Sequence, residues 1–152
     1  MTAAGRCLVT GAGGFIGSAL TGRLEGEYRE VWRLVRPGTA SSDAPRTLAA
    51  DLAAAVPPLE RLAPFDAIFH LAGRVHAADR HASADAEHAR ANVEGTRNLL
   101  AAAARSGARR IVFTSSVAAM GPGAPTCLDE SAPPRPVTAY GRTKRRAEEL
   151  VL

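Results

Sequence analysis

The stretch Thr10-Gly11-Ala12-Gly13-Gly14-Phe15-Ile16-Gly17 lies between a short apolar run and an amphipathic segment, and it decides the fold. Three of its glycines each serve a mechanical purpose. Gly11 permits a tight turn, Gly14 lets the backbone approach a pyrophosphate, and Gly17 lets a following helix pack closely on the preceding strand. The amino terminus of that helix offers unbonded N–H groups and a partial positive charge, which suit phosphate oxygens. A glycine-rich turn between a strand and a helix therefore predicts a dinucleotide-binding site.

Outside this turn the sequence alternates short apolar runs with segments of helical periodicity. Such alternation is typical of a parallel sheet whose connections are helices. We expect strands at residues 7–10, 31–35, 47–50, 67–71 and 110–114, helices at 16–24, 83–105 and 137–152, a brief helix opened by Pro57-Pro58, a helix cap at Gly107 and a loop over 121–136. The predicted fold class is α/β, a Rossmann-type doubly wound parallel sheet of about five strands in the order 3-2-1-4-5. The fifth strand would then form an edge of the sheet.

Length and composition narrow the class of protein. The 152 residues are 46% hydrophobic and 22% charged, which suits one globular domain and excludes disorder, collagen and coiled coil as the main description. No apolar run reaches the ~18–20 residues that span a bilayer, and no signal-peptide pattern stands at the start, so we expect no membrane association. Cys7 and Cys127 lie 120 positions apart and offer neither a disulfide framework nor a metal spacing, which indicates a cytoplasmic location.

The chain is basic, with 19 Lys and Arg residues against 15 Asp and Glu. Arginine accounts for 18 of these cations, and together with the abundant alanine and glycine this indicates a compositional bias. The arginines are scattered, and no aromatic residues interleave with their small clusters at 109–110 and 142–146. We therefore expect solvated helix faces and no nucleic-acid partner.

The only lysine, Lys144, follows Tyr140 by four positions in a chain that has two tyrosines. Residues i and i+4 share one face of a helix, so the phenol and the ammonium are expected to point the same way. A nearby ammonium favours the phenolate form, which makes Tyr140 a credible general acid or base. The alternative is a surface tyrosine packed over a lysine stem.

Together these features resemble the extended short-chain dehydrogenase/reductase family, or NAD-dependent epimerase/dehydratase family, whose members include nucleotide-sugar epimerases, dehydratases and reductases. The similarity covers nearly the whole chain, and its motifs appear in the family's order. They are the turn at 10–17, His70-Leu71-Ala72-Gly73, Asn92 to Leu100, Thr114-Ser115-Ser116 and Tyr140-Gly141-Arg142-Thr143-Lys144.

The resemblance implies hydride transfer between a substrate carbon and a nicotinamide, with Ser116, Tyr140 and Lys144 as catalytic residues. Ser116 would hydrogen-bond the substrate oxygen, with Ser115 beside it in the pocket, while Tyr140 would move the hydroxyl proton. Asn92 would support the site. The implied cofactor-binding residues are Gly11, Gly14, Phe15, Ile16, Gly17, Arg36, Asp51, Leu52, Leu71, Ala72, Gly73, Asn92, Tyr140 and Lys144.

The end of the second expected strand bears on the choice of cofactor. NAD-preferring members usually carry there an acidic residue that binds the ribose 2′-hydroxyl, whereas this chain reads Leu34-Val35-Arg36-Pro37. A 2′-phosphate would favour Arg36, with Arg33 as a second cation. We expect NADP(H), with NAD as the alternative, in which case Arg36 stacks on the adenine or faces water.

The expected substrate is a nucleotide-linked sugar, since the run His70 to His76 is similar to that of bacterial reductases and epimerases acting on such sugars. Val117 and Ala118 stand where 4,6-dehydratases carry an Asp-Glu pair, which disfavours dehydration. A carbonyl reductase of the dihydroflavonol-reductase type, which shares the Val-Arg strand ending, is an alternative. No metal site is expected, because His76, His81 and His88 have no strong zinc spacing.

Members of the family normally continue through further strands and a C-terminal substrate-binding region, whereas Lys144 lies eight residues before the last residue. The resemblance therefore implies that residues 1–152 form a dinucleotide-binding (Rossmann) domain that is incomplete at its C-terminus. A catalytically weak or inactive NAD(P)-binding module is the corresponding alternative function. Family members often pair through the long helix and the tyrosine-bearing helix, which implies a homodimer.

Overall fold

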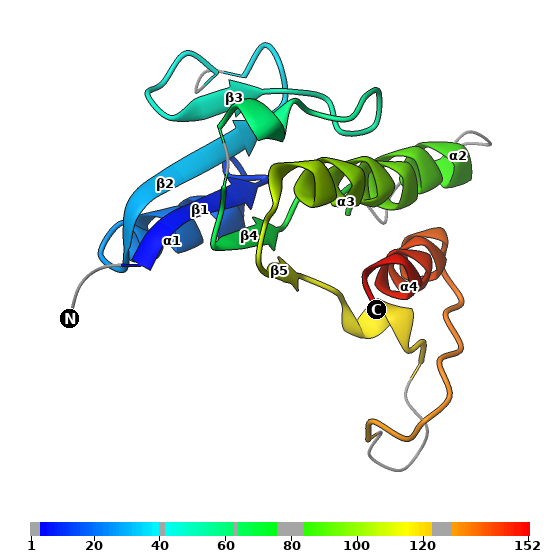
Figure 1. The fold of residues 1–152 in the computed structure, drawn as a ribbon. Helices are drawn as coiled ribbons and strands as arrows, with labels where there is room; N and C mark the ends of the chain where they lie inside the picture. The colour runs from blue at the N-terminus through cyan, green and yellow to red at the C-terminus, as the bar shows by residue number, and fades with distance from the viewer. Residues whose placement is uncertain (1–3, 40–41, 63, 76–83, 123–128) are drawn as a thin grey trace.

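The computed structural model describes residues 4–39, 42–62, 64–75, 84–122 and 129–152. Within these residues, five parallel strands form one sheet in the order β3-β2-β1-β4-β5 (Figure 1), which confirms the predicted fold class. The strands are β1 (Ala4–Thr10), β2 (Tyr28–Val35), β3 (Thr47–Ala49), β4 (Ala67–His70) and β5 (Ile111–Phe113). The helical segments are α1 (Phe15–Leu24), η1 (Leu59–Arg61), α2 (Ala84–His88), η2 (Ala89–Glu94), α3 (Gly95–Ser106), η3 (Val117–Ala119) and α4 (Ala139–Val151).

Apolar side chains of the central strand β1 point alternately to the two faces of the sheet. Leu8 belongs to a buried cluster with Leu99 of α3, and Cys7 and Val9 belong to a second cluster with Leu24 of α1. The helices α1 and α3 therefore cover opposite faces of β1 (Figure 1). Burial on both faces explains why strands of a parallel sheet read as nearly continuous apolar runs.

The long helix expected over 83–105 is interrupted in the structure. A π-helical turn, η2, joins α2 to α3, and Asn92 lies within this turn. Such turns are rare, and they occur frequently at functional sites. The prediction for Gly107 is confirmed, since this residue ends α3 in the left-handed conformation with a φ of +66°.

Helix α4 begins at Ala139, later than the predicted 137, because Thr138 caps it. Thr138 Oγ1 accepts a 2.9 Å hydrogen bond from the backbone N–H of Gly141. The helix packs on η3, η2, α2 and β5, and β5 forms an edge of the described sheet as expected. None of the helices that the structure describes combines the length and the apolar character that a membrane crossing requires.

Candidate active site

The glycine turn lies at the carboxyl end of β1, and close backbone contacts require two of its glycines. Gly11 has a φ of +68°, and a Cβ there would lie 2.8 Å from the amide nitrogen of Ala72. A Cβ on Gly17 would lie 2.1 Å from the carbonyl oxygen of Gly11, so α1 approaches the turn only without a side chain here. A Cβ on Gly14 would lie 3.3 Å from its nearest described atom, so packing within the chain excludes a side chain less strictly here. Close approach of a phosphate is still the expected reason for Gly14.

The amino terminus of α1 is open to solvent directly after this turn. Phe15 is 95% exposed and Ile16 is 60% exposed. The first N–H groups of a helix have no partner within the helix, so an exposed helix start can receive phosphate oxygens. The residues present therefore suit a pyrophosphate at this position.

Two arginines near the end of β2 have different surroundings. Arg33 forms an ion pair with Glu25, the residue that follows α1. Arg36 directly follows the last residue of β2 and is exposed. Because the charge of Arg33 is already partly neutralised, Arg36 is the better placed of the two to bind an added phosphate.

The segment that follows β3 contains the predicted pair Asp51 and Leu52. Asp51 Oδ1 accepts a 3.0 Å hydrogen bond from the N–H of Ala53, and its Oδ2 lies 3.5 Å from a nitrogen of Arg90. Leu52 is buried, and its carbonyl oxygen accepts a 2.8 Å hydrogen bond from Asn98 Nδ2. These bonds hold the segment against η2 and α3.

The predicted residues Leu71, Ala72 and Gly73 directly follow β4. The N–H of Leu71 donates to the Thr10 carbonyl oxygen at 3.3 Å, and the N–H of Ala72 donates to Thr10 Oγ1 at 3.1 Å. The segment therefore lies beside the glycine turn. The predicted cofactor-side segments meet at the carboxyl edge of the sheet, which is where ligands bind in doubly wound α/β folds.

Asn92 joins the segment after β4 to α4. Its Oδ1 accepts a 2.7 Å hydrogen bond from the N–H of Arg74, and its Nδ2 donates to the carbonyl oxygen of Arg74 at 3.1 Å and to Thr143 Oγ1 at 3.0 Å. The side chain is 2% exposed. Its polar atoms are bonded within the chain, so the geometry lets Asn92 hold the segment after β4 and α4 together.

Ser115 and Ser116 follow β5 and have different partners. Ser116 Oγ accepts a 3.2 Å hydrogen bond from the N–H of Ala118 and so caps the turn η3. Ser115 donates its hydroxyl proton to a carboxylate oxygen of Glu148 on α4. Among the described residues the Ser116 hydroxyl proton has no acceptor, so it could be donated to a bound oxygen, whereas Ser115 already donates its proton to Glu148.

Tyr140 and Lys144 lie one turn apart on α4, as predicted. Lys144 Nζ donates a 2.6 Å hydrogen bond to the Thr114 carbonyl oxygen and lies 4.0 Å from the centre of the Phe113 ring. Burial lowers the pKa of Lys144 to about 8, although the nearby Glu148 raises it. The ammonium thus bonds to the end of β5 rather than to the Tyr140 hydroxyl.

Sequence reasoning missed the structural role of Gly141. A Cβ at this position would lie 2.2 Å from the carbonyl oxygen of Ala118. The backbone of α4 therefore lies directly on η3, the turn that Ser116 caps, and this contact brings the helix of Tyr140 to the serine segment. Glycine inside a helix is unfavourable unless close packing requires it. Its presence within the predicted helix was therefore the available signal for this contact.

The histidine spacing in the sequence argues against a metal site and predicts no other role for His88, but the structure places its ring against Tyr140. The two ring centres are 6.1 Å apart, His88 is 3% exposed, and its Nδ1 has no hydrogen-bond partner among the described residues. His88 precedes Asn92 by four positions, and this spacing was the available sequence signal that His88 lies close to the candidate site. His76 and His81 lie outside the described residues, among which no group of three or more His, Cys, Asp or Glu could hold a metal ion.

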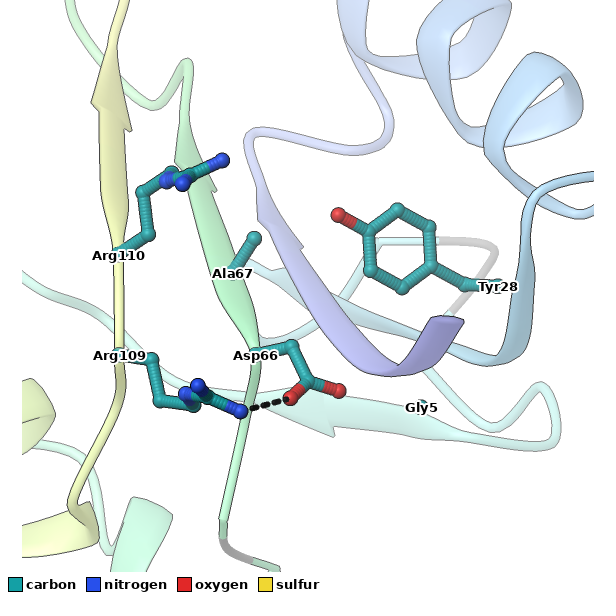
Figure 2. A pocket seen from close by; sticks show the side chains of 6 residues that line it. All are labelled: Gly5, Tyr28, Asp66, Ala67, Arg109 and Arg110. Carbon is teal, nitrogen blue, oxygen red and sulfur yellow. Dashed lines mark ion pairs between the residues drawn. The ribbon is translucent and has the colours of Figure 1, made fainter. Parts of the chain in front are cut away.

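A hollow of about 410 Å³ lies at the opposite, amino end of the sheet (Figure 2). It is lined by Gly5, Tyr28, Asp66, Ala67, Arg109 and Arg110. The Arg109 guanidinium lies 3.7 Å from the Asp66 carboxylate, with which it forms an ion pair (Figure 2). None of the predicted site residues lines this hollow, and ligands of doubly wound sheets bind at the carboxyl end, so it is not the candidate site.

Comparison with known proteins links the chain to one family. The model of the NAD dependent epimerase/dehydratase family matches residues 7–152. A 3-diazoavenalumate denitrifying reductase from a Streptomyces species is 34% identical over 95% of this chain, which covers 50% of that protein. A 4-hydroxy-2-methyl-3-oxo-4-farnesyl-3,4-dihydroquinoline-1-oxide ketoreductase from Stigmatella aurantiaca is 36% identical over 97% of this chain, which covers 45% of that protein.

Solved structures agree with this result. MoeE5 in complex with UDP-glucuronic acid and NAD superimposes with a TM-score of 0.81 at 34% identity, over 96% of this chain and 48% of that structure. Uronate dehydrogenase from Agrobacterium tumefaciens superimposes with a TM-score of 0.81 at 30% identity, over 98% of this chain and 55% of that structure. The chain spans about half the length of the curated relatives that it matches.

Proposed function

Because this chain belongs to the NAD-dependent epimerase/dehydratase family, we propose that it forms the dinucleotide-binding domain of an enzyme that transfers hydride to or from a nucleotide-linked sugar. The proposed domain comprises residues 1–152, which span about half the length of the curated relatives that the chain matches. The whole enzyme would act as an epimerase or a reductase. We propose the cytoplasm as its compartment, since the described cysteine, Cys7, is a buried free thiol.

One observation carries this proposal. The close contact between Gly141 and Ala118 brings the helix of Tyr140 and Lys144 onto the turn that Ser116 caps. The same edge of the sheet carries the glycine turn. The helix of Tyr140, the Ser116 hydroxyl and the glycine turn therefore lie at one end of the sheet, and this arrangement supports hydride transfer to a bound carbonyl as the proposed reaction.

Three side chains would perform the proton chemistry. Ser116 would donate a hydrogen bond to the substrate oxygen, because its own oxygen accepts from Ala118 and its proton is free. Tyr140 would give its phenol proton to that oxygen in reduction and take it back in oxidation. Lys144 would supply a positive charge beside the phenol and bind the cofactor ribose. A bound nicotinamide would supply or accept the hydride at the substrate carbon.

The proposed cofactor is NADP(H), with NAD as the alternative. Exposed Arg36 at the end of β2, where NAD-preferring members usually carry an acidic residue, supports NADP(H). The solved structure of MoeE5 contains NAD, which supports the alternative. The residues proposed for the pyrophosphate are Gly11, Gly14, Phe15, Ile16 and Gly17, and those for the remainder of the cofactor are Arg36, Asp51, Leu52, Leu71, Ala72, Gly73, Asn92, Tyr140 and Lys144.

A second candidate function is reduction of a small carbonyl compound that is not a nucleotide sugar. The two curated relatives that match nearly the whole chain are named as a reductase and a ketoreductase, which favours this alternative. A third is cofactor binding without turnover, because the chain covers about half of those relatives. A homodimer is the proposed assembly, by analogy with the family.

Fluorescence titration with NADPH and NADH tests the proposed cofactor site. Turnover of UDP-glucuronic acid, UDP-glucose and an aromatic ketone, followed by the absorbance of the reduced cofactor, then distinguishes the candidate functions. Tyr140→Phe is expected to abolish any turnover and leave cofactor binding measurable. Tyr28→Phe is the matched control, since Tyr28 is the other tyrosine and lines the hollow at the amino end of the sheet. A chain that bound neither cofactor, or a turnover that Tyr140→Phe did not change, would contradict the proposal.

A further inference from the structure

We propose that His70 is a positioning residue of the candidate site, which holds the glycine turn and α4 in a fixed relation through a neutral imidazole protonated on Nε2. This role rests on the proposed function, because it concerns the same site. His70 is the last residue of β4, and its side chain is 2% exposed. Both ring nitrogens lie within hydrogen-bond distance of threonine hydroxyls.

Thr96 on α3 determines where the imidazole proton lies. Its hydroxyl oxygen is 2.6 Å from the carbonyl oxygen of Asn92 and 3.0 Å from Nε2 of His70. A carbonyl oxygen can only accept a hydrogen bond, so the single hydroxyl proton of Thr96 goes to Asn92. The Thr96 oxygen must then accept from His70, and Nε2 must therefore carry the proton.

Thr10 completes the arrangement on the other side of the ring. Its hydroxyl oxygen lies 2.7 Å from Nδ1 of His70 and accepts a 3.1 Å hydrogen bond from the N–H of Ala72. In a neutral ring that is protonated on Nε2, Nδ1 is an acceptor, so Thr10 donates its proton to it. The hydrogen bonds run in one direction from Ala72 through Thr10, His70 and Thr96 to Asn92, and each hydroxyl both donates and accepts.

Burial and a neighbouring charge keep the ring neutral. Burial lowers the pKa of His70 to about 3, and the Lys144 ammonium contributes further to this decrease. Phe113 contacts both groups, with its ring centre 5.6 Å from that of His70 and 4.0 Å from the ammonium nitrogen. A proton added to the imidazole would therefore be buried near a second positive charge.

The hydrogen bonds continue from Asn92 to the helix of the candidate catalytic residues. Asn92 Nδ2 donates to Thr143 Oγ1 at 3.0 Å, and Thr143 donates in turn to the carbonyl oxygen of Tyr140 at 2.9 Å. At the other end, Thr10 directly precedes Gly11. His70 is thus the central member of a hydrogen-bonded path from the glycine turn to α4, and an apolar residue of similar size would fill its volume without making this path.

Nitrogen-15 NMR of the imidazole in the full chain tests the tautomer directly. We expect a protonated Nε2 with a slowly exchanging hydrogen, an unprotonated Nδ1, and no titration of the ring down to about pH 5, well above the lowered pKa of His70. A proton on Nδ1, a mixture of tautomers, or a charged ring at neutral pH would overturn the proposal.

Two variants of Thr96 test the positioning role. Thr96→Val removes the hydroxyl at nearly constant volume and leaves Nε2–H of His70 and the Asn92 carbonyl without this partner, whereas Thr96→Ser keeps the hydroxyl. We expect amide hydrogen exchange in η2 and α4 to become at least roughly fivefold faster in Thr96→Val and to change little in Thr96→Ser. Exchange in α1, on the opposite face of the sheet, is expected to stay unchanged. Equal acceleration in α1 and α4 would indicate general destabilisation and overturn the positioning role, as would no acceleration in α4.

These readouts do not depend on a bound cofactor. Failure of NADPH and NADH to perturb the spectrum of the wild-type chain would contradict the proposed function. The imidazole tautomer and the exchange pattern would still sustain or overturn the role of His70 in holding the turn and α4 together.

Discussion

The ammonium of Lys144 donates a 2.6 Å hydrogen bond to the backbone carbonyl oxygen of Thr114, two positions before Ser116. This bond ties α4 to the end of β5, next to the point where Ser115 bonds to Glu148 of the same helix. Lys144 therefore helps to place the serine segment, in addition to the role proposed for it toward the ribose and the phenol. Arginine would not reproduce this arrangement directly, because its larger planar guanidinium presents its donors differently from the compact ammonium that bonds to Thr114.

The lowered pKa of Lys144 predicts how stability depends on pH. Its value is about 8 in the folded chain against 10.5 for the unperturbed group. Between these values the unfolded chain holds a proton that the folded chain has released, so the contribution of Lys144 to the free energy of unfolding rises with pH. Below about pH 8 both states are protonated, and the contribution is constant.

Denaturant unfolding of the wild type and of Lys144→Met at several pH values measures this effect. The difference, wild type minus variant, is expected to be flat near neutral pH and to rise between about pH 8 and 10.5. Taking the difference removes the contribution of Cys7, whose pKa burial raises to about 12 and whose effect on stability has the opposite sign in the alkaline range. A difference that fell over this interval would contradict the buried ammonium.

Gly141→Ala is expected to destabilise the chain. The added methyl group would lie 2.2 Å from the Ala118 carbonyl oxygen, so α4 or η3 must move. Overpacking of this kind costs about 1–3 kcal/mol, which thermal or denaturant unfolding can measure. Any cofactor-dependent turnover should fall further than stability alone explains, because the shift separates Tyr140 from Ser116.

Gly22→Ala is the matched control for this prediction. Gly22 lies in α1, and a Cβ there would meet no atom within 4 Å. Alanine is favoured over glycine in a helix by about 0.5–1 kcal/mol, so this variant should be more stable than the wild type. Similar destabilisation by both substitutions would show that the close contact at Ala118 is not the cause.

His88→Phe is expected to retain or increase stability. The Nδ1 atom of His88 is buried with no hydrogen-bond partner among the described residues, and such an unmade bond costs about 1–3 kcal/mol. Phenylalanine keeps a ring against Tyr140 and removes the polar atoms, with some of the gain offset by its larger volume. The free energy of unfolding at neutral pH measures the effect, with His88→Gln as the polar control. Loss of stability in the phenylalanine variant but not in the glutamine variant would contradict this expectation.

Arg36→Ala is expected to reduce affinity for NADPH and to leave affinity for NADH nearly unchanged. A hydrogen bond to a charged group contributes about 1.5–3 kcal/mol, so the loss for NADPH should be at least roughly tenfold. Fluorescence titration of both cofactors measures the two affinities. Arg33→Ala is the control and should have the smaller effect, because Arg33 is paired with Glu25. Equal losses for NADPH and NADH would exclude a 2′-phosphate contact and favour stacking of Arg36 on the adenine.

The fold was predictable because it depends on local patterns. The apolar runs, the glycine turn and the capping Gly107 are each read over a few neighbouring residues, and the alternation of strand and helix restricts the sheet order to few possibilities. Strand boundaries were less accurate. Tyr28 pairs with Ala4, so β2 begins earlier than its apolar core, and this pairing depends on a partner strand that periodicity does not describe.

The candidate site was predictable in its residue types and less so in its contacts. The spacing of Tyr140 and Lys144 predicted a shared helix face, which the structure has. The same spacing gave no sign that the ammonium bonds to the carbonyl oxygen of Thr114, thirty positions earlier. The interruption of the long helix at Asn92 had no signal in the helical periodicity, because the residues of the π turn keep a helical composition.

The sequence by itself determined the order of the elements, the glycine turn and the residue types available for phosphate binding and proton transfer, because these follow from patterns among near neighbours. Only the tertiary structure decided in which direction each hydroxyl donates and which nitrogen of the His70 imidazole carries the proton. It also gave the reason that Gly141 must be a glycine. The bonds of His70 and Thr10 join residues 26 to 62 positions apart, and the direction of such a bond is known only when both partners are in place.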